Sequence, residues 1–152
     1  MQQFVAYRPI DAKCSMSLGY KTVLIVDPDA DIRELLLTAL TLEGVKVETA
    51  STGVAALQML YRTGIDLLIV EAELPDVKTG TVIDRIKHSP KQIPIIVIAA
   101  NRSEAFEKVL REKGVFTYIT KPFSLELLKI AVRDALASRS KTTNGGGQKD
   151  IS

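Results

Sequence analysis

Several residue types are scarce in this chain of 152 residues, which has one cysteine, one histidine and no tryptophan. Cys14 has no partner for a disulfide within the chain, and this favours a reducing compartment. No apolar run approaches the roughly 20 residues of a transmembrane helix, and the N-terminus lacks the apolar segment of a secretory signal. We therefore expect a cytoplasmic protein that does not enter a membrane. A single histidine also excludes a cluster of histidine and cysteine metal ligands.

A strong charge of one sign is missing too. The formal net charge is +2, and the stretch from 22 to 137 carries 14 basic and 16 acidic side chains. This balance argues against direct binding of nucleic acid. With 46% hydrophobic and 25% charged residues, the composition is that of a globular protein of one domain.

Short apolar runs alternate with segments of helical periodicity from Thr22 onward. Strands are predicted at 22–26, 45–49, 66–70, 94–99 and 115–119. Helices are predicted from Ala30 to Glu43, from a cap at Ser51 or Thr52 to Gly64, around Val82 to about His88, from a capping box at 101–104 to Gly114, and from a cap at Ser124 to about Ala137. Strands that are apolar throughout are buried on both faces. The pattern therefore predicts an α/β fold with a parallel sheet between two helical layers.

The two ends of the chain lack this pattern. Residues 1–20 show no periodicity and are interpreted as a flexible N-terminal extension, in which Met1 and Met16 both remain possible native starts. Residues 139–152 are polar and rich in glycine, and we expect a disordered C-terminal tail.

Acidic side chains and one lysine follow the predicted strands. In an open parallel sheet, functional residues gather at the carboxyl ends of the strands. The residues that follow or end the strands there are Asp27, Pro28 and Asp29 for the first, Glu71 and Glu73 for the third, Ala99 for the fourth, and Lys121 and Pro122 for the fifth. One interpretation of this edge is a divalent-cation site formed by Asp27, Asp29, Glu71 and Glu73.

Four stretches, in this order and spacing, resemble the response-regulator receiver family. They are Val23–Leu36, Asp66–Glu71 with Leu74 and Pro75, Pro94–Ala100, and Tyr118–Phe123. The resemblance covers residues 21–138 and implies a flavodoxin-like, doubly wound (βα)5 sandwich with a five-stranded sheet in the order 2-1-3-4-5. It also implies a role in two-component, or phosphorelay, signal transduction, and a cis peptide bond before Pro122.

The resemblance further implies a phosphorylation site, from which this chain departs. In the family, an aspartate ending the third strand accepts the phosphoryl group and two adjacent acids after the first strand hold Mg²⁺. A serine or threonine ending the fourth strand and a lysine bind the phosphoryl group, and an aromatic residue shortly before that lysine turns inward in response. The matching positions here are Glu71 for the acceptor, Asp27 and Pro28 for the acids, Ala99 for the hydroxyl, Lys121 for the lysine, Tyr118 for the aromatic residue, and Thr79 for a glycine common in the next loop.

Three of these positions argue against phosphorylation in the usual way. Pro28 has no carboxylate for Mg²⁺, which requires near-octahedral oxygen coordination. The extra methylene of Glu71 displaces its carboxylate by about 1 Å, and such an error costs about a hundredfold in rate. Ala99 removes a hydrogen-bond donor worth about 1 kcal/mol. We expect no enzymatic activity and no cofactor, with Mg²⁺ at most weakly held by Asp27.

The sequence therefore predicts a stand-alone, atypical receiver, or pseudo-receiver, that acts through protein–protein contacts. The contact residues predicted on the fourth helix, fifth strand and fifth helix are Lys108, Arg111, Lys113, Tyr118, Lys129 and Arg133. The partner is another signalling protein or a second copy. A phosphorylatable receiver with a shifted acceptor or Mg²⁺ site and a cation-binding protein remain alternatives. A pair between Glu71 and Lys121 would either imitate the phosphorylated state or simply replace the metal site with an ion pair.

Overall fold

The computed structural model describes residues 21–62 and 64–145, with only the course of the backbone for 139–145. The predicted N-terminal extension, both candidate starts and Cys14 lie outside the described residues, as do residues 146–152. No helix within the described part of the chain is both long and apolar enough to cross a membrane.

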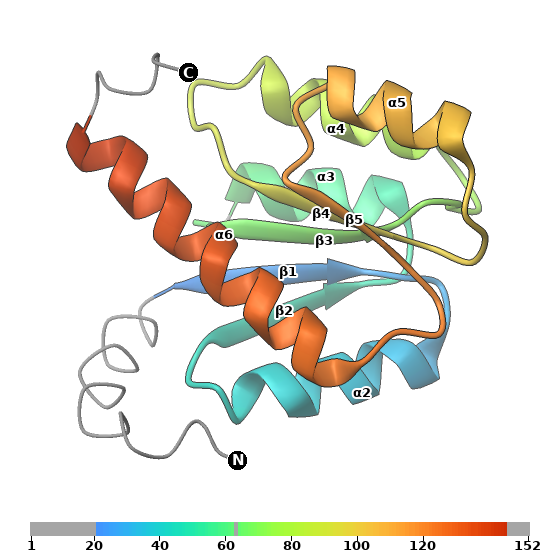
Figure 1. Ribbon diagram of the computed structural model, residues 1–152, viewed down its shortest axis with the longest axis horizontal. Helices are drawn as coiled ribbons and strands as arrows, with labels where there is room; N and C mark the ends of the chain where they lie inside the picture. Colours follow the sequence, from blue (N-terminus) through green and yellow to red (C-terminus); the bar gives the residue numbers. More distant parts are fainter. Residues whose placement is uncertain (1–20, 63, 146–152) are drawn as a thin grey trace.

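The described chain forms a five-stranded parallel sheet and five helices (Figure 1). The strands are β1 (Thr22–Val26), β2 (Lys46–Ala50), β3 (Leu67–Glu71), β4 (Ile95–Ala99) and β5 (Thr117–Thr120). The helices are α2 (Ala30–Thr41), α3 (Gly53–Arg62), α4 (Thr79–Lys87), α5 (Glu104–Glu112) and α6 (Leu125–Gly145). Neighbouring strands follow the order β2-β1-β3-β4-β5, so the predicted fold class and strand order are confirmed.

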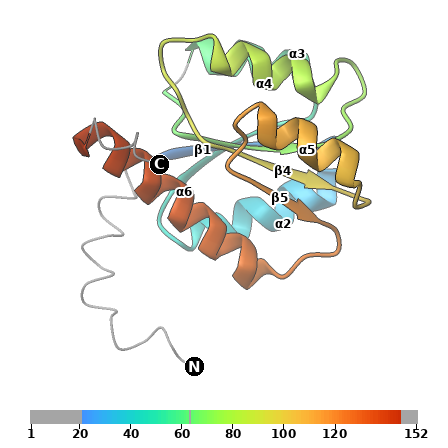
Figure 2. The same ribbon diagram turned by 45° about the horizontal axis from the view of Figure 1, so that its top comes forward.

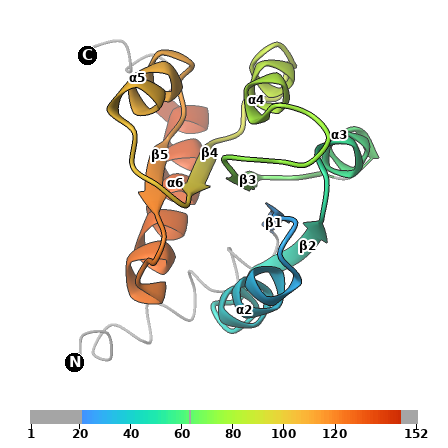
Figure 3. The same cartoon turned by 90° about the vertical axis from the view of Figure 1, so that its right-hand side faces the viewer.

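Both faces of the sheet are covered by helices. Because successive side chains of a strand point to opposite faces, Val23 and Ile25 of β1 pack with α2 and α6, whereas Leu24 and Val26 pack with α3, α4 and α5. Figures 1 and 3 show this division of the helices between the two faces. The strands β1, β3 and β4 are buried almost without interruption, which explains why their sequences are apolar throughout.

Several helix ends differ from the sequence prediction by two residues or more. Helix α6 continues to Gly145, beyond the predicted helix end near Ala137 and into the stretch predicted as a C-terminal tail. No glycine or proline occurs between Leu125 and Asn144, and the polar composition alone does not stop a helix from adding hydrogen bonds along its axis. Helix α5 is capped by Ser103, whose hydroxyl accepts a hydrogen bond from the Phe106 amide, and begins later than the predicted box at Asn101.

Candidate functional site

Three charged side chains from three different strands meet at one edge of the sheet. Asp27 follows β1, Glu71 is the last residue of β3, and Lys121 follows β5. The Lys121 Nζ atom lies 2.7 Å from Glu71 Oε1 and 3.5 Å from Asp27 Oδ2. Asp27 and Glu71 are only 3% and 7% exposed, so both carboxylates are screened from water and depend on the lysine for charge compensation.

Backbone amides complete the environment of the two carboxylates. Asp27 Oδ1 accepts a hydrogen bond of 2.8 Å from the Asp29 amide, and Glu71 Oε2 accepts a longer one of 3.4 Å from the Glu73 amide. These contacts use an oxygen of each carboxylate that does not face Lys121. Each carboxylate is thus held between an amide on one side and an ammonium group on the other.

The ammonium group of Lys121 is stabilised in its charged form. Burial alone would lower the pKa of Lys121, but the hydrogen bond to Glu71 and the negative charges of Asp27 and Glu71 outweigh it. The pKa of Lys121 is therefore raised above its ordinary value of 10.5. At neutral pH the site contains a fixed positive charge between two carboxylates.

The residues at this edge do not fit a magnesium ion. Asp29 caps helix α2 by accepting a hydrogen bond from the Asp31 amide, and Pro28 and Glu73 are exposed. In the ranges 21–62 and 64–145, no three histidine, cysteine, aspartate or glutamate side chains are placed to hold a metal. The four acids considered for a cation site are therefore not brought together, and the Lys121 ammonium occupies the space between Asp27 and Glu71.

Ala99 lies beside this cluster at the end of β4. It is 3% exposed, and its carbonyl oxygen accepts a hydrogen bond of 2.8 Å from the Lys121 amide. The peptide bond from Lys121 to Pro122 is cis, as the resemblance implied. The ends of β4 and β5 are therefore paired at position 99, where the side chain is a methyl group without a hydrogen-bond donor.

Tyr118 is fixed against the segment that follows β4. Its hydroxyl donates a hydrogen bond of 3.0 Å to the Asn101 carbonyl oxygen and lies 3.4 Å from the Ser103 amide. The ring packs edge-on against Phe106, with the centroids 6.0 Å apart. Tyr118 thus joins β5 to the start of α5 and does not project freely into solvent.

Two polar residues for which the sequence predicts no contact at the site also hold it. The Thr79 hydroxyl donates a hydrogen bond of 2.7 Å to the Glu71 carbonyl oxygen, and Thr79 is 3% exposed. Arg33 Nη1 donates one of 2.7 Å to the Asp27 carbonyl oxygen. Thr79 stands out in the sequence because it occupies a position where the family commonly has a glycine. Its hydrogen bond to Glu71, which ends β3 eight residues earlier, is seen only in the structure.

The loop after β3 is fastened to the first turn of α3. Asp76 accepts hydrogen bonds of 2.9 Å from the Gly53 and Val54 amides, one on each carboxylate oxygen. These bonds to Val54 and Gly53 lower the pKa of Asp76. The side chain therefore caps a helix that begins 23 residues earlier, and no local pattern in the sequence announces such a cap.

Substituting Gly53 by alanine is expected to destabilise the protein by about 1–3 kcal/mol, as overpacking of a tight contact does. A Cβ at Gly53 would collide with Cγ2 of Val77 and lie 3.3 Å from Asp76 Oδ1. Urea unfolding measures the change. Gly80→Ala is the control, since its nearest contact, with Lys113 Cε at 3.7 Å, is ordinary and it lies in helix α4. We expect it to be neutral or stabilising by up to about 1 kcal/mol; equal effects of the two substitutions would contradict the steric argument.

Four of the six residues predicted as a partner surface form ion pairs within the described chain. Arg133 Nη2 and Lys129 Nζ reach Glu43 at the end of α2, at 2.6 Å and 3.7 Å. Those two side chains therefore lie on the side of α6 that faces α2. Lys113 forms an ion pair of 2.8 Å with Asp84, and Arg111 forms one of 3.0 Å with Glu107. Of the predicted basic residues, Lys108 has no ion pair with another described residue.

Comparisons with known proteins agree with this architecture. Residues 23–133 match the family model described as the response regulator receiver domain. The response regulator MprA of Mycobacterium leprae is 34% identical over 119 residues, which cover 78% of this chain and 52% of that protein. The chain thus spans about half the length of this relative.

Two solved structures are similar in three dimensions. A response regulator receiver domain protein from Methanospirillum hungatei is 25% identical with a TM-score of 0.75, covering 80% of this chain and 97% of that one. The beryllofluoride-activated NtrC4 receiver domain dimer is 27% identical with a TM-score of 0.75, covering 79% of this chain and 99% of that one.

Proposed function

The chain belongs to the response regulator receiver domain family, and from this membership we propose that it is an atypical receiver of two-component signalling. It acts in the cytoplasm through protein–protein contacts, is not phosphorylated in the usual way, and is not an enzyme. The Glu71 carboxylate and the Lys121 ammonium form a permanent ion pair at the site.

The observation that carries this proposal is the hydrogen bond of 2.7 Å from Lys121 Nζ to Glu71 Oε1. The lysine that would bind an incoming phosphoryl group is already bound to the residue at the acceptor position. Two buried carboxylates next to it would repel a phosphate dianion, because Lys121 is the one side chain of the described residues that forms an ion pair with them. Phosphoryl transfer depends mainly on positioning and charge neutralisation, and both are missing here.

The position of Tyr118 supports a single fixed state. The hydroxyl is bonded to the segment between β4 and α5, and the ring packs on Phe106. In the family, the matching aromatic residue responds to a new charge at the site. Here the longer side chain of Glu71 places its carboxylate against Lys121, where the phosphoryl group would lie, at all times. We therefore propose that Tyr118 and the start of α5 remain in one arrangement.

The contact surface of the proposal lies along α5, β5 and α6, which Figure 3 shows next to one another. Its large apolar side chains are exposed by 43% for Val109, 39% for Phe116, 52% for Leu127 and 55% for Ile130. Exposed apolar side chains on neighbouring elements are typical of interaction surfaces. The similar NtrC4 receiver domain is a dimer in its activated form, and a second copy or another signalling protein would cover these residues here.

Incubating the protein with acetyl phosphate and Mg²⁺ is expected to leave its intact mass unchanged, because the site has neither a correctly placed acceptor nor a metal-binding pair of acids. Mass spectrometry of the intact chain checks this, with a phosphorylatable receiver treated in parallel. A stable gain of one phosphoryl mass would overturn the proposal. It would instead favour a shifted acceptor, which peptide mapping would locate.

A further inference from the structure

A pocket lies near the amino ends of the central strands, opposite the edge that carries Glu71 and Lys121. It is a pocket of about 480 Å³ between the ends of α3 and α4, two helices that lie on the same face of the sheet (Figure 2). Ile65 and Ile93, which line it, precede β3 and β4. The pocket is therefore at the amino ends of strands whose carboxyl ends form the site described above. Its volume is within the range of roughly 300–1,000 Å³ found for small-molecule sites.

The interior of this pocket is aliphatic. The aliphatic lining consists of Leu57, Leu60, Ile65, Ile86 and Ile93. The three isoleucines are 2–4% exposed and belong to the packed core, so this floor is rigid. The ring of Tyr61 stands at the rim and is 77% exposed. Such a surface favours the apolar body of a ligand.

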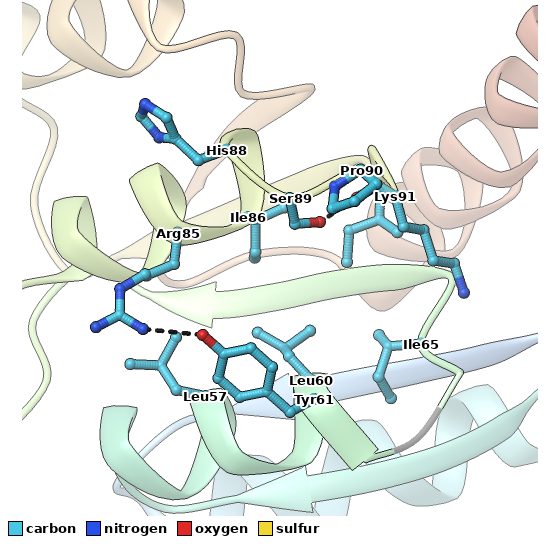
Figure 4. A pocket seen from close by; sticks show the side chains of 11 residues that line it. Leu57, Leu60, Tyr61, Ile65, Arg85, Ile86, His88, Ser89, Pro90 and Lys91 are labelled. Atoms are coloured by element: carbon cyan, nitrogen blue, oxygen red, sulfur yellow. Dashed lines mark hydrogen bonds between the residues drawn. The ribbon is translucent and has the colours of Figure 1, made fainter.

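The charge at the rim of the pocket is positive. Arg85 and Lys91 contribute to the lining, and no aspartate or glutamate of the described chain does. Lys91 is partly compensated by Asp66, at 3.8 Å. Within residues 21–62 and 64–145, no carboxylate lies within ion-pair distance of Arg85. His88 also contributes to the lining, but Figure 4 shows its ring pointing away from Tyr61.

The guanidinium group of Arg85 is held in place by a neutral hydrogen-bond partner. Its Nη1 atom donates a hydrogen bond of 3.1 Å to the Tyr61 hydroxyl, which joins α4 to α3 across the pocket (Figure 4). A guanidinium group has five N–H donors in a planar fork, and this contact uses one of them. The remaining donors suit a carboxylate, which arginine binds through two parallel hydrogen bonds.

From this combination we infer that the pocket between α3 and α4 binds a small amphipathic carboxylate, with its apolar part on the aliphatic floor and its carboxylate on Arg85. The inference goes beyond the proposed function. It concerns the opposite edge of the sheet, uses none of the residues near Glu71, and is tested without phosphorylation.

The test is a titration of the full chain with octanoate and with octanol, followed by NMR of labelled isoleucine and leucine methyl groups. Octanoate is expected to shift the methyl signals of Ile65, Ile86 and Ile93 in a saturable manner, while those of Ile25 on the other face of the sheet remain unchanged. Octanol has the same chain without the charge. We expect it to bind about tenfold more weakly, the factor that 1.4 kcal/mol represents.

Two matched variants assign the contact. Arg85→Gln should remove the tenfold preference for octanoate and leave octanol binding unchanged. Arg111→Gln should leave both unchanged, because Arg111 lies on α5 and pairs with Glu107. Absence of saturable shifts at the pocket methyls, equal binding of the two probes, or equal effects of the two substitutions would each overturn the inference. Shifts that appear on raising the protein concentration alone would also overturn it, and would make this surface a contact between copies.

Discussion

Replacing Pro28 by aspartate, Glu71 by aspartate and Ala99 by serine together is expected to produce a chain that takes up a phosphoryl group from acetyl phosphate and Mg²⁺. Pro28 is exposed, so a carboxylate there meets no steric barrier and gives Mg²⁺ a second acid beside Asp27. A shorter side chain at position 71 brings the acceptor oxygen back by about 1 Å, and serine at position 99 restores a hydrogen-bond donor. We expect the rate to rise at least about a hundredfold, the effect of correcting a misplacement of this size. Intact mass after incubation measures the outcome.

The single substitutions serve as controls for the triple variant. Glu71→Asp alone still lacks the second acid, and Pro28→Asp alone still has Lys121 bonded to Glu71, so we expect little phosphorylation of either. Circular dichroism must show that the triple variant is folded. A folded triple variant that remains unmodified would mean that these three positions do not decide whether the chain accepts a phosphoryl group.

Replacing Lys121 by methionine is expected to destabilise the protein by about 3 kcal/mol. The substitution leaves the carboxylates of Asp27 and Glu71, whose side chains are 4% and 8% exposed, without a compensating charge. Removing one partner of a buried ion pair typically costs 3–5 kcal/mol. The lower limit applies because the Lys121 side chain is 25% exposed. The free energy of unfolding in urea is the measurement.

A double variant and a pH series separate charge from packing. Glu71→Gln combined with Lys121→Met removes one of the two uncompensated charges and should recover part of the lost stability. The wild type should also lose stability at alkaline pH. Because the folded-state pKa of Lys121 is raised above 10.5, its contribution is complete below that pH and disappears as the pH rises through the folded-state value. If Lys121→Met lost stability over the same alkaline range to the same extent, another group would be responsible.

The sequence predicts the architecture of this protein well because its signals are local. Apolar runs such as Val23–Val26 and Leu67–Val70 are long enough to define strands buried on both faces, and the caps at Asp29 and Ser124 mark helix starts. The position of Asp27, Glu71 and Lys121 at one edge follows from parallel strands alone. The sequence therefore identifies the members of the cluster and raises the pair of Glu71 with Lys121, whereas the contact of Lys121 with Asp27 is seen only in the structure.

Contacts between distant segments account for what the sequence does not show. The cap that Asp76 provides for α3 and the pairs of Lys129 and Arg133 with Glu43 join segments far apart in the chain. For Lys129 and Arg133, the sequence places both residues on a helix but does not show that they contact Glu43. A charged residue on an exposed helix has no periodic signal that distinguishes contact with solvent from contact with a neighbouring helix.

The bond between Glu71 and Lys121 has a consequence for how long a signal can last. A phosphorylated aspartate is an acyl phosphate that water hydrolyses. In an ordinary receiver, this hydrolysis limits the lifetime of the phosphorylated state. The carboxylate of Glu71 belongs to the polypeptide and is not lost by hydrolysis. If the Glu71 carboxylate carries the signal, the signalling state persists until the protein is degraded. Synthesis and degradation of the protein then take over the timing that a kinase and a phosphatase would otherwise provide.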